Sequence, residues 1–245
     1  MRAHVTFEKM TRRRIFVGDV HGCFDELMLL MNEVNFEPEK DTLVSVGDLF
    51  RKGPLSGEVM DWARRNHVLC VRGNHEERLL KQRKKWTKGN FDPTENPDTP
   101  LMSRFSDADF EWLKALPYSI DFPQDRILVV HAGVMSGKIM SEHTPFELTE
   151  MRAVSESGEA EKICKDPSRQ WAKLYNGEIP GLGERRIVFG HDAARGLQLE
   201  KHATGLDTGC VYGKHLTCLV VQQNEPSSIV TVRSLQQYCK PEVKE

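Results

Sequence analysis

No stretch of this sequence is apolar over the ~18 residues that a membrane-spanning helix needs, which excludes a membrane-embedded protein. The first residues, MRAHVTFEKMTRRR, lack the apolar core of a secretory signal. We therefore expect an intracellular protein, cytoplasmic or nuclear, with the basic run at 12–14 as a weak nuclear signal. The six cysteines include no Cys-x-x-Cys pair, so free, buried thiols are expected and not a disulfide framework.

An excess of either charge is also missing. The formal net charge of −2 gives no global attraction to nucleic acid, so any contact with a polyanion has to be local. What is present, 39% hydrophobic and 29% charged residues, is typical of a soluble globular protein. No repeat or second compositional block interrupts the 245 residues. We expect one domain over 1–245, with 1–13 as a candidate disordered extension and no obligate protein partner.

Short apolar runs alternate with amphipathic segments through the first half of the chain. Strands are expected at 14–19, 41–48, 67–77, 126–133, 185–192, 202–210, 216–223 and 228–235. Helices are expected at 23–34, 56–66, from 76 onward and at 106–117, with Ser56 and Ser106 as N-caps. The polar segment 86–104 is expected to form a loop or lid. This order predicts an α/β protein.

Five apolar runs end in residues that can bind metal, four of them after a glycine. These residues are Asp19, His21, Asp48, Asn74, His75, His131 and His191. Loops at the carboxyl ends of strands in an α/β sheet converge on one crevice. A glycine lets the backbone turn sharply and approach an ion closely. Each motif alone is typical of a turn, but five repeats together indicate a common site.

The residue types indicate which metal would bind. The set holds no cysteine, which argues against a structural zinc cluster. Imidazoles mixed with carboxylates and an amide oxygen suit Mn²⁺, Fe or Zn²⁺ in an open catalytic site. Six ligands suffice for two ions if one carboxylate bridges them. Two ions about 3.5–4 Å apart activate a shared water and stabilise an in-line displacement, which points to hydrolysis of phosphoesters or phosphoanhydrides.

The motifs GDVHG, GDLFRKG, RGNHE, HAG and GH, spread from residue 18 to 192, resemble the phosphoprotein-phosphatase branch of the binuclear metallophosphoesterases. The segments TEMRAV (149–154), VFGHDAARGLQ (188–198) and GLDTGCVYGKHLTCL (205–219) are similar to the symmetrical diadenosine tetraphosphatases and their ApaH-like relatives. The resemblance implies a four-layer fold, a central β-sandwich flanked by helices. It also implies two divalent ions, Mn²⁺ first, with Fe, Zn²⁺ or Co²⁺ as alternatives.

The same resemblance implies a role for each position. Asp19 and His21 bind the first metal, Asp48 bridges, and Asn74, His131 and His191 bind the second. His75 is the general acid that protonates the leaving oxygen. Arg152 and Lys52 contact substrate phosphate, and Arg72 is grouped with them as a residue that supports the pocket through an ion pair.

The chain departs from the phosphatase pattern at Arg51 and Lys52, where the family has Asp-Arg. The missing Asp would orient the acid histidine. A cation in its place disfavours imidazolium, unless Glu76, Asp192 or Asp207 takes over the task. Lysine keeps the positive charge of arginine but loses its bidentate geometry. This pair favours a polyphosphate over a phosphoprotein, since a phosphate leaving group needs less help from an acid.

The predicted function is therefore hydrolysis of a nucleoside polyphosphate, namely diadenosine tetraphosphate cleaved symmetrically or a capped RNA 5′ end. Basic residues between 81 and 88, interleaved with Trp86 and Phe91, could bind a nucleotide by phosphate contact and stacking, or form a solvated helix end. The alternatives are a protein serine/threonine phosphatase and an inactive nucleotide-binding module. The intact ligand set argues against the inactive module.

Overall fold

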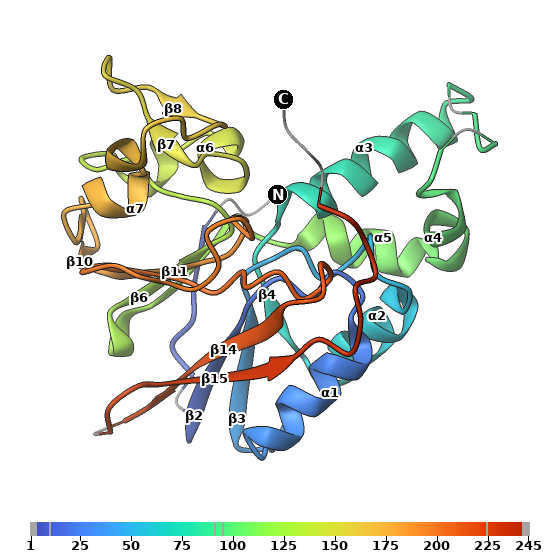
Figure 1. The fold of residues 1–245 in the computed structure, drawn as a ribbon, viewed down its shortest axis with the longest axis horizontal. Helices are drawn as coiled ribbons and strands as arrows, with labels where there is room; N and C mark the ends of the chain where they lie inside the picture. Colours follow the sequence, from blue (N-terminus) through green and yellow to red (C-terminus); the bar gives the residue numbers. More distant parts are fainter. Residues whose placement is uncertain (1–3, 10, 91, 95, 224, 242–245) are drawn as a thin grey trace.

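Two mixed β-sheets form the centre of the protein (Figure 1). The computed structural model describes residues 4–9, 11–90, 92–94, 96–223 and 225–241. The first sheet has the order β15-β14-β2-β3-β4, with β2 (Arg13–Val17), β3 (Asp41–Ser45), β4 (Leu69–Cys70), β14 (His215–Gln222) and β15 (Ser228–Arg233). The second has the order β1-β5-β6-β11-β13-β12, with β1 (His4–Thr6), β5 (Ser119–Phe122), β6 (Ile127–Val130), β11 (Arg186–Phe189), β12 (Gln198–Leu199) and β13 (Ala203–Gly205).

Both faces of the central strands are buried, which explains why these strands appear as unbroken apolar runs. In β2, Ile15 and Val17 belong to a core shared with helices, whereas Phe16 between them packs into the core between the two sheets. In β11, Val188 likewise packs between the sheets and Phe189 packs outward. The two sheets therefore form a sandwich, and each has a second layer on its outer face.

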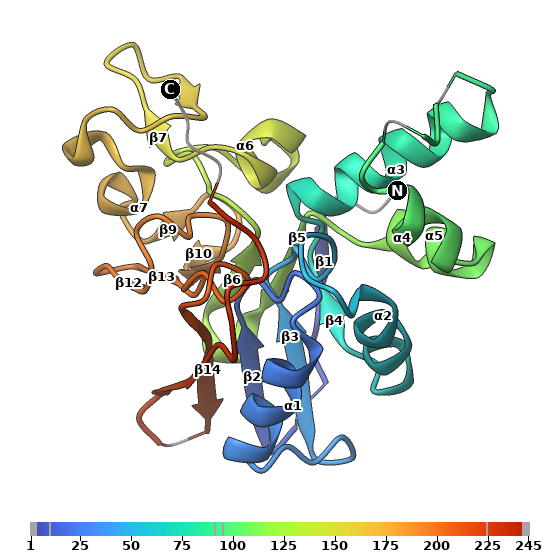
Figure 2. The same cartoon turned by 45° about the vertical axis from the view of Figure 1, so that its right-hand side comes forward.

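Helices cover the outer face of the first sheet, and shorter elements cover the second (Figure 2). The first set is α1 (Phe24–Glu33), α2 (Ser56–Arg65), α3 (Asn74–Thr87), α4 (Thr99–Arg104) and α5 (Asp107–Ala115). The second is α6 (Pro145–Thr149), α7 (Trp171–Leu174) and the hairpin strands β7 (Ala153–Val154), β8 (Ala160–Glu161), β9 (Glu178–Ile179) and β10 (Gly183–Glu184). Single-turn 3₁₀ helices lie at Pro123–Asp125, Met140–Glu142 and Pro167–Arg169. The predicted four-layer α/β fold is confirmed.

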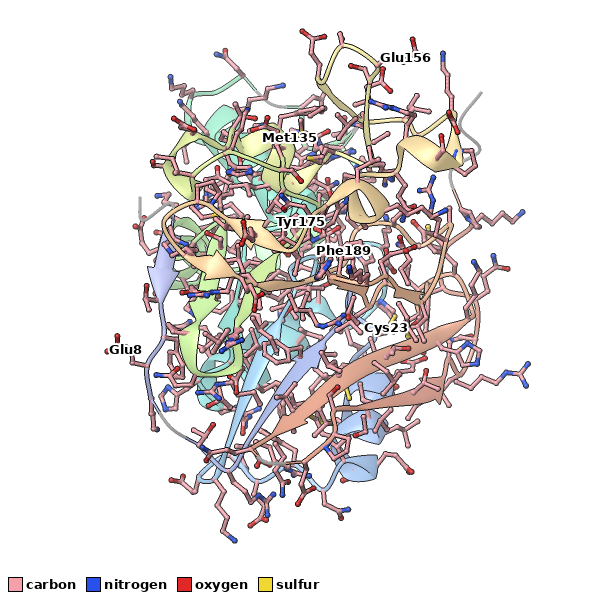
Figure 3. The ribbon with its side chains drawn as sticks, turned by 90° about the vertical axis from the view of Figure 1, so that its left-hand side faces the viewer. Glu8, Cys23, Met135, Glu156, Tyr175 and Phe189 are labelled. Carbon is pink, nitrogen blue, oxygen red and sulfur yellow. The ribbon has the colours of Figure 1, made fainter. Side chains whose placement is uncertain are left out.

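The outer layer on the second sheet has its own apolar core. Met135, Tyr175 and Phe189 lie in it (Figure 3). Trp171 packs edge-on against Phe189, with 4.8 Å between ring centroids. This layer fixes the segment that follows β6 and the segment that contains Arg152, both of which reach the candidate site.

Parallel pairing brings the loops together. β2 runs parallel to β3, and β3 to β4, in the first sheet. β11 runs parallel to both β6 and β13 in the second. The carboxyl ends of these strands point to the same edge of the sandwich, where ligands bind in α/β folds.

Several local expectations are corrected. Residues 4–6 lie within the candidate disordered extension, yet they form β1 and pair in parallel with β5. The predicted loop 86–104 contains the end of α3 and all of α4. Ser56 is the first residue of α2 and not its N-cap, and its hydroxyl accepts from the Arg51 backbone instead. Ser106 does cap α5, accepting from the Asp109 N–H, as predicted.

The cysteines are free, as expected, and four of the six are buried: Cys23, Cys70, Cys210 and Cys218. Among the described residues, no helix combines the length and apolar character needed to cross a bilayer.

Candidate metal centre

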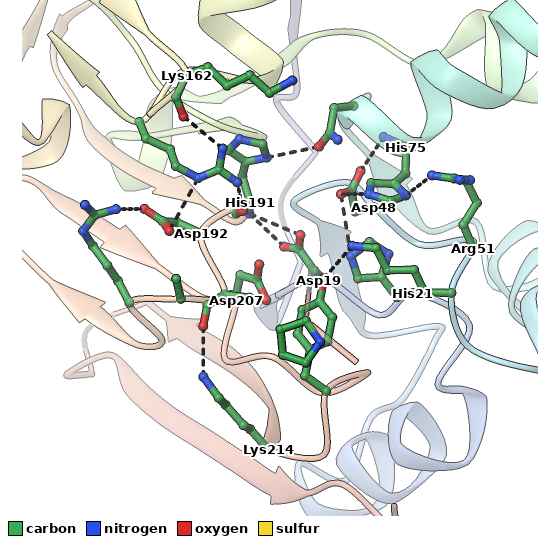
Figure 4. Close-up of a pocket in the computed structure, with 18 of the residues that line it drawn as sticks. Asp19, His21, Asp48, Arg51, His75, Lys162, His191, Asp192, Asp207 and Lys214 are labelled. Carbon is green, nitrogen blue, oxygen red and sulfur yellow. Dashed lines mark hydrogen bonds and ion pairs between the residues drawn. The ribbon is translucent and has the colours of Figure 1, made fainter. Parts of the chain in front are cut away.

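The loops after five strands bring all the predicted ligands to one edge of the sandwich. Figure 4 shows Asp19, His21, Asp48 and His191 among them. Asp19 and His21 follow β2, Asp48 follows β3, Asn74 follows β4 and opens α3, His131 follows β6, and His191 follows β11. Three of these residues have left-handed backbone conformations, with φ of 49° at His21, 52° at Asp48 and 71° at His191. Such conformations are strained in residues other than glycine, and strained residues of this kind cluster at functional sites.

The glycines before the ligands are required because the backbone there lies very close to neighbouring carboxylates. A Cβ added to Gly190 would lie 2.0 Å from Asp19 Oδ1, and one on Gly73 would lie 2.2 Å from Asp48 Oδ1. Both contacts are far inside van der Waals distance. The glycines thus let backbone and carboxylates pack directly together, as the sequence indicated.

Asp48 lies at the centre of the cluster. Its Oδ2 is 3.4 Å from His131 Nε2 and 3.7 Å from His21 Nε2, so it lies between imidazoles from both sheets. Its Oδ1 accepts from the His75 backbone N–H at 2.9 Å. Burial alone would raise the pKa of Asp48, but the neighbouring imidazoles of His131 and His75 hold it well below its usual range. This is the position that a bridging carboxylate would occupy.

A second group of ligand atoms surrounds Asn74. Its Oδ1 lies 3.0 Å from His131 Nε2 and 3.1 Å from His191 Nδ1. The His191 backbone N–H is 3.2 Å from both oxygens of Asp19. An amide oxygen and two imidazole nitrogens that converge at these distances form a ready set of metal donors.

Charge in the site also fits bound cations. Asp19, Asp48 and Asp207 are all buried in the same pocket. Burial, followed by the charges of Asp207 and Asp48, raises the pKa of Asp19 well above its usual value. Burial raises the pKa of Asp207 to about 6. Three buried carboxylates require compensating positive charge, which divalent ions would supply.

The imidazoles are held in the neutral form that ligation requires. Burial and then Lys52 lower the pKa of His21 to about 3, and burial and His131 lower that of His191 well below 6.5. His131 is the exception: burial lowers its pKa, but Asp48, Glu76 and the Val46 carbonyl together outweigh burial and raise it. The Nδ1 atom of His131 lies 2.8 Å from the Val46 carbonyl, which directs Nε2 into the cluster.

Glu76 holds the loops together from behind. It is fully buried and accepts from three backbone N–H groups, those of Asp48, Leu49 and Gly73, at 2.9–3.0 Å. Both of its oxygens bind this backbone, so Glu76 does not take the place of the missing aspartate beside His75. Burial, then the charge of Asp48, raises its pKa to about 7.

Five of the six predicted ligands line an open pocket of about 580 Å³, and the sixth, His131, is fully buried beside Asp48. Seven cationic residues line it: Arg51, Lys52, Arg78, Arg152, Lys162, Arg195 and Lys214. Lys52 donates to the Tyr212 hydroxyl at 2.7 Å and lies 5.1 Å from the centre of that ring. Arg152 donates to the His191 carbonyl at 3.0 Å and lies 3.6 Å from Asp192. Both predicted phosphate contacts therefore reach the pocket.

Arg72 does not reach it. Its guanidinium is buried, donates to Glu77 at 2.8 Å and to the carbonyls of Leu113 and Lys114, and lies over the ring of Tyr118. The predicted ion pair is present, but this orientation argues against placing Arg72 among the residues that contact phosphate.

The predicted nucleotide-binding segment is also away from the pocket. Trp86 is partly buried against the helical core, and Arg83 lies 6.0 Å from the centre of its ring. Phe91 lies outside the described residues. Among the described residues, Tyr212 is the tyrosine that lines the pocket, and it lies in the motif GLDTGCVYGKHLTCL, whose sequence alone indicated no role for it.

The comparisons with known proteins agree with this geometry. Residues 12–216 match the calcineurin-like phosphoesterase family, and the chain belongs to that family. It is 30% identical to the symmetrical bis(5′-nucleosyl)-tetraphosphatases of Yersinia pestis and Yersinia pseudotuberculosis, over 83% of this chain and 87% of theirs. A crystal structure of a candidate diadenosine tetraphosphatase superposes with a TM-score of 0.82 and 34% identity, covering 96% of this chain and 99% of that one. A yeast protein serine/threonine phosphatase shares the fold at a TM-score of 0.62 and 16% identity, covering 99% of this chain and 86% of that one.

Proposed function

We propose that this protein hydrolyses nucleoside polyphosphates, with diadenosine tetraphosphate as the leading substrate, cleaved symmetrically. A capped RNA 5′ end is the related alternative. The observation that carries the proposal is the ring of cations around a carboxylate-imidazole cluster in one pocket. Such a pocket suits a chain of phosphates, whose charges are distributed along its length. The similarity to symmetrical tetraphosphatases supports the same substrate class.

Asp19, His21, Asp48, Asn74, His131 and His191 would hold two divalent ions, Mn²⁺ first among them. Bound there, the ions would activate water and neutralise charge on the phosphate under attack. Lys52 and Arg152 would bind and orient the remaining phosphates. His75 directs its Nε2 into the cluster, 3.9 Å from Asp48 Oδ2, where it can contact the leaving oxygen.

The decisive experiment is a product analysis of the Mn²⁺-loaded protein on diadenosine tetraphosphate. We expect two ADP molecules from each substrate molecule, measured by anion-exchange chromatography. A phosphoserine peptide serves as the comparison, and we expect much slower turnover of it. Faster turnover of the peptide would refute the proposal and favour the protein phosphatase.

Lys52→Met tests the phosphate contact. The substitution removes a charge held over the cluster by Tyr212, so kcat/KM for the tetraphosphate should fall about 10-fold or more. Tyr212→Phe is the matched control, because it keeps Lys52 and removes only the hydroxyl that positions it. An unchanged kcat/KM in Lys52→Met would show that Lys52 does not contact the substrate.

A further inference from the structure

The side chain of Arg51 is buried and makes two sets of contacts. Its Nε and Nη2 donate to the two carboxylate oxygens of Asp98 at 2.8 and 2.9 Å, in a bidentate pair. Its Nη1 lies 2.5 Å from Nδ1 of His75 (Figure 4). Asp98 immediately precedes α4, and it sits in the segment predicted as a lid. Asp98, Arg51 and His75 therefore form one continuous chain of hydrogen bonds that ends in the pocket.

The direction of the last bond follows from chemistry. A guanidinium has only donors and does not lose its proton in proteins. Nδ1 of His75 must therefore accept, which leaves the single ring proton of the neutral imidazole on Nε2. Nε2 is the atom that faces the metal cluster, 3.9 Å from Asp48 Oδ2.

The carboxylates considered as substitutes are bound elsewhere. Glu76 accepts from backbone N–H groups, Asp192 pairs with Arg152 and Arg195, and Asp207 accepts from the Gly209 N–H. Within the described part of the chain, the hydrogen-bond partner of His75 Nδ1 is Arg51. The backbone supports this arrangement, since Arg51 has a φ of 77° and Lys52 of 66°. Two successive left-handed residues bring the Arg51 guanidinium to His75 and the Lys52 ammonium to the Tyr212 hydroxyl in the pocket.

We propose that Asp98 and Arg51 are positioning residues that hold His75 as a neutral Nε2–H hydrogen-bond donor, and that the enzyme is thereby restricted to substrates whose leaving oxygen departs as a stable anion. This inference rests on the proposed hydrolytic function. The bond between phosphorus and the leaving oxygen breaks, and that oxygen keeps the electron pair. A new bond forms to the oxygen of water, whose proton goes to solvent. His75 stabilises the departing oxygen by hydrogen bonding and keeps its own proton, because losing it would leave an imidazolate.

The substrate class follows. Phosphoanhydrides and aryl esters release oxygens that carry negative charge readily, whereas an alkyl ester such as phosphoserine needs a proton delivered in the transition state. A protein with this hydrogen-bond chain should therefore hydrolyse anhydrides well and alkyl phosphates poorly, whatever group recognises the rest of the substrate.

The first test is leaving-group dependence, measured with 4-nitrophenyl, phenyl and ethyl phosphate. The wild-type enzyme should show a steep fall in kcat/KM along this series. The double variant Arg51→Asp/Asp98→Asn places an acceptor at Nδ1 and avoids two facing carboxylates, so His75 can donate a proton. We expect the activity on ethyl phosphate relative to 4-nitrophenyl phosphate to rise about 10-fold or more. An unchanged ratio would overturn the inference.

The second test observes the proton directly, by ¹⁵N-¹H NMR of Zn²⁺-loaded protein with the His75 signals assigned from His75→Gln. Wild-type protein should show Nδ1 unprotonated and Nε2 protonated, and Arg51→Leu should lose this preference. If Arg51→Leu fails to fold, Asp98→Asn provides the same comparison, because it leaves the Arg51 side chain in place and removes only the carboxylate that holds it. Asp98→Glu keeps that carboxylate and should give the wild-type spectrum. A protonated Nδ1 in wild-type protein, or an unchanged tautomer in the folded variants, would refute the inference.

Arg104→Gln is the matched control. Arg104 lies in α4 and pairs with Asp61 at the surface, outside the residues that line the pocket, so its loss should leave the tautomer and the leaving-group dependence unchanged. The simple esters contain no nucleotide, which separates the two proposals. Wild-type protein could fail to hydrolyse diadenosine tetraphosphate and still show the steep leaving-group dependence with the simple esters. That result would refute the proposed substrate and support the role of Arg51.

Discussion

Asp48→Asn should abolish hydrolysis, with a fall in kcat on the order of 10³-fold or more, because the metal site contributes several kcal/mol to transition-state stabilisation. Asp48 lies between imidazoles from both sheets, at 3.4 Å from His131 and 3.7 Å from His21. An amide there loses the charge that attracts two cations and offers a single acceptor oxygen. The amount of metal bound per protein molecule should fall in parallel, and elemental analysis of the dialysed protein measures it.

A matched control separates loss of the site from loss of the fold. Asp121→Asn removes an equally buried carboxylate on β5, which pairs with Arg185 far from the ligand cluster. That variant should lose stability and keep both its metal and its kcat. Full activity in Asp48→Asn would refute the bridging role of Asp48. If this variant loses activity but still binds nucleotide, the wild-type protein is not merely an inactive nucleotide-binding module.

Arg72→Met should lower the free energy of unfolding by about 3–5 kcal/mol, because breaking a buried ion pair leaves its partner uncompensated. Arg72 is 1% exposed, and it binds Glu77 and two backbone carbonyls in the last turn of α5. Denaturant unfolding at pH 7 measures the loss. KM for the tetraphosphate should change little, since the guanidinium is directed away from the pocket.

The stabilisation that the Arg72–Glu77 pair contributes should depend on pH. Burial would raise the pKa of Glu77, but hydrogen bonds from Arg72 and Tyr118 outweigh it and lower the pKa below 4.5. The stabilisation is therefore present above that value and is lost as the pH falls through the lowered pKa. The difference in the free energy of unfolding between wild-type protein and Arg72→Met should therefore become smaller in acid.

Arg104→Met provides the comparison for Arg72→Met. Arg104 pairs with Asp61 at the surface, and both side chains are about half exposed, so its removal should cost less than about 1 kcal/mol. A raised KM with unchanged stability in Arg72→Met would instead place Arg72 among the phosphate contacts, as predicted from the sequence.

The convergence of the predicted ligands could be read from the sequence because each of them lies within four residues of the end of a strand. Val17 and Gly18 precede Asp19, and Phe189 and Gly190 precede His191, so strand periodicity and glycine placement give the position of the side chain. The parallel pairing of those strands then fixes their convergence. Their roles as ligands, and the single domain over 1–245, stay predictions.

Asp98 could not be found in the same way. It is 47 residues from Arg51 and follows a polar segment without hydrophobic periodicity, so nothing in its neighbourhood indicates that it reaches the site. Tyr212 is separated from Lys52 by 160 residues for a similar reason. Trp86 lies in a basic, aromatic stretch whose sequence suits either a nucleotide-binding surface or a solvated helix end, and only the fold shows that its ring packs partly on the helical core. Contacts between loops depend on the tertiary fold, and single-sequence patterns do not report them.

The origin of the ligands in two different sheets has a thermodynamic consequence. Asp19, His21, Asp48 and Asn74 follow strands of the first sheet, and His131 and His191 follow strands of the second. Ions bound by both groups would cross-link the halves of the sandwich and would bind the unfolded chain poorly. By linkage, the folding equilibrium then depends on the free metal concentration. A melting temperature of this protein therefore has a defined meaning only at a stated metal activity.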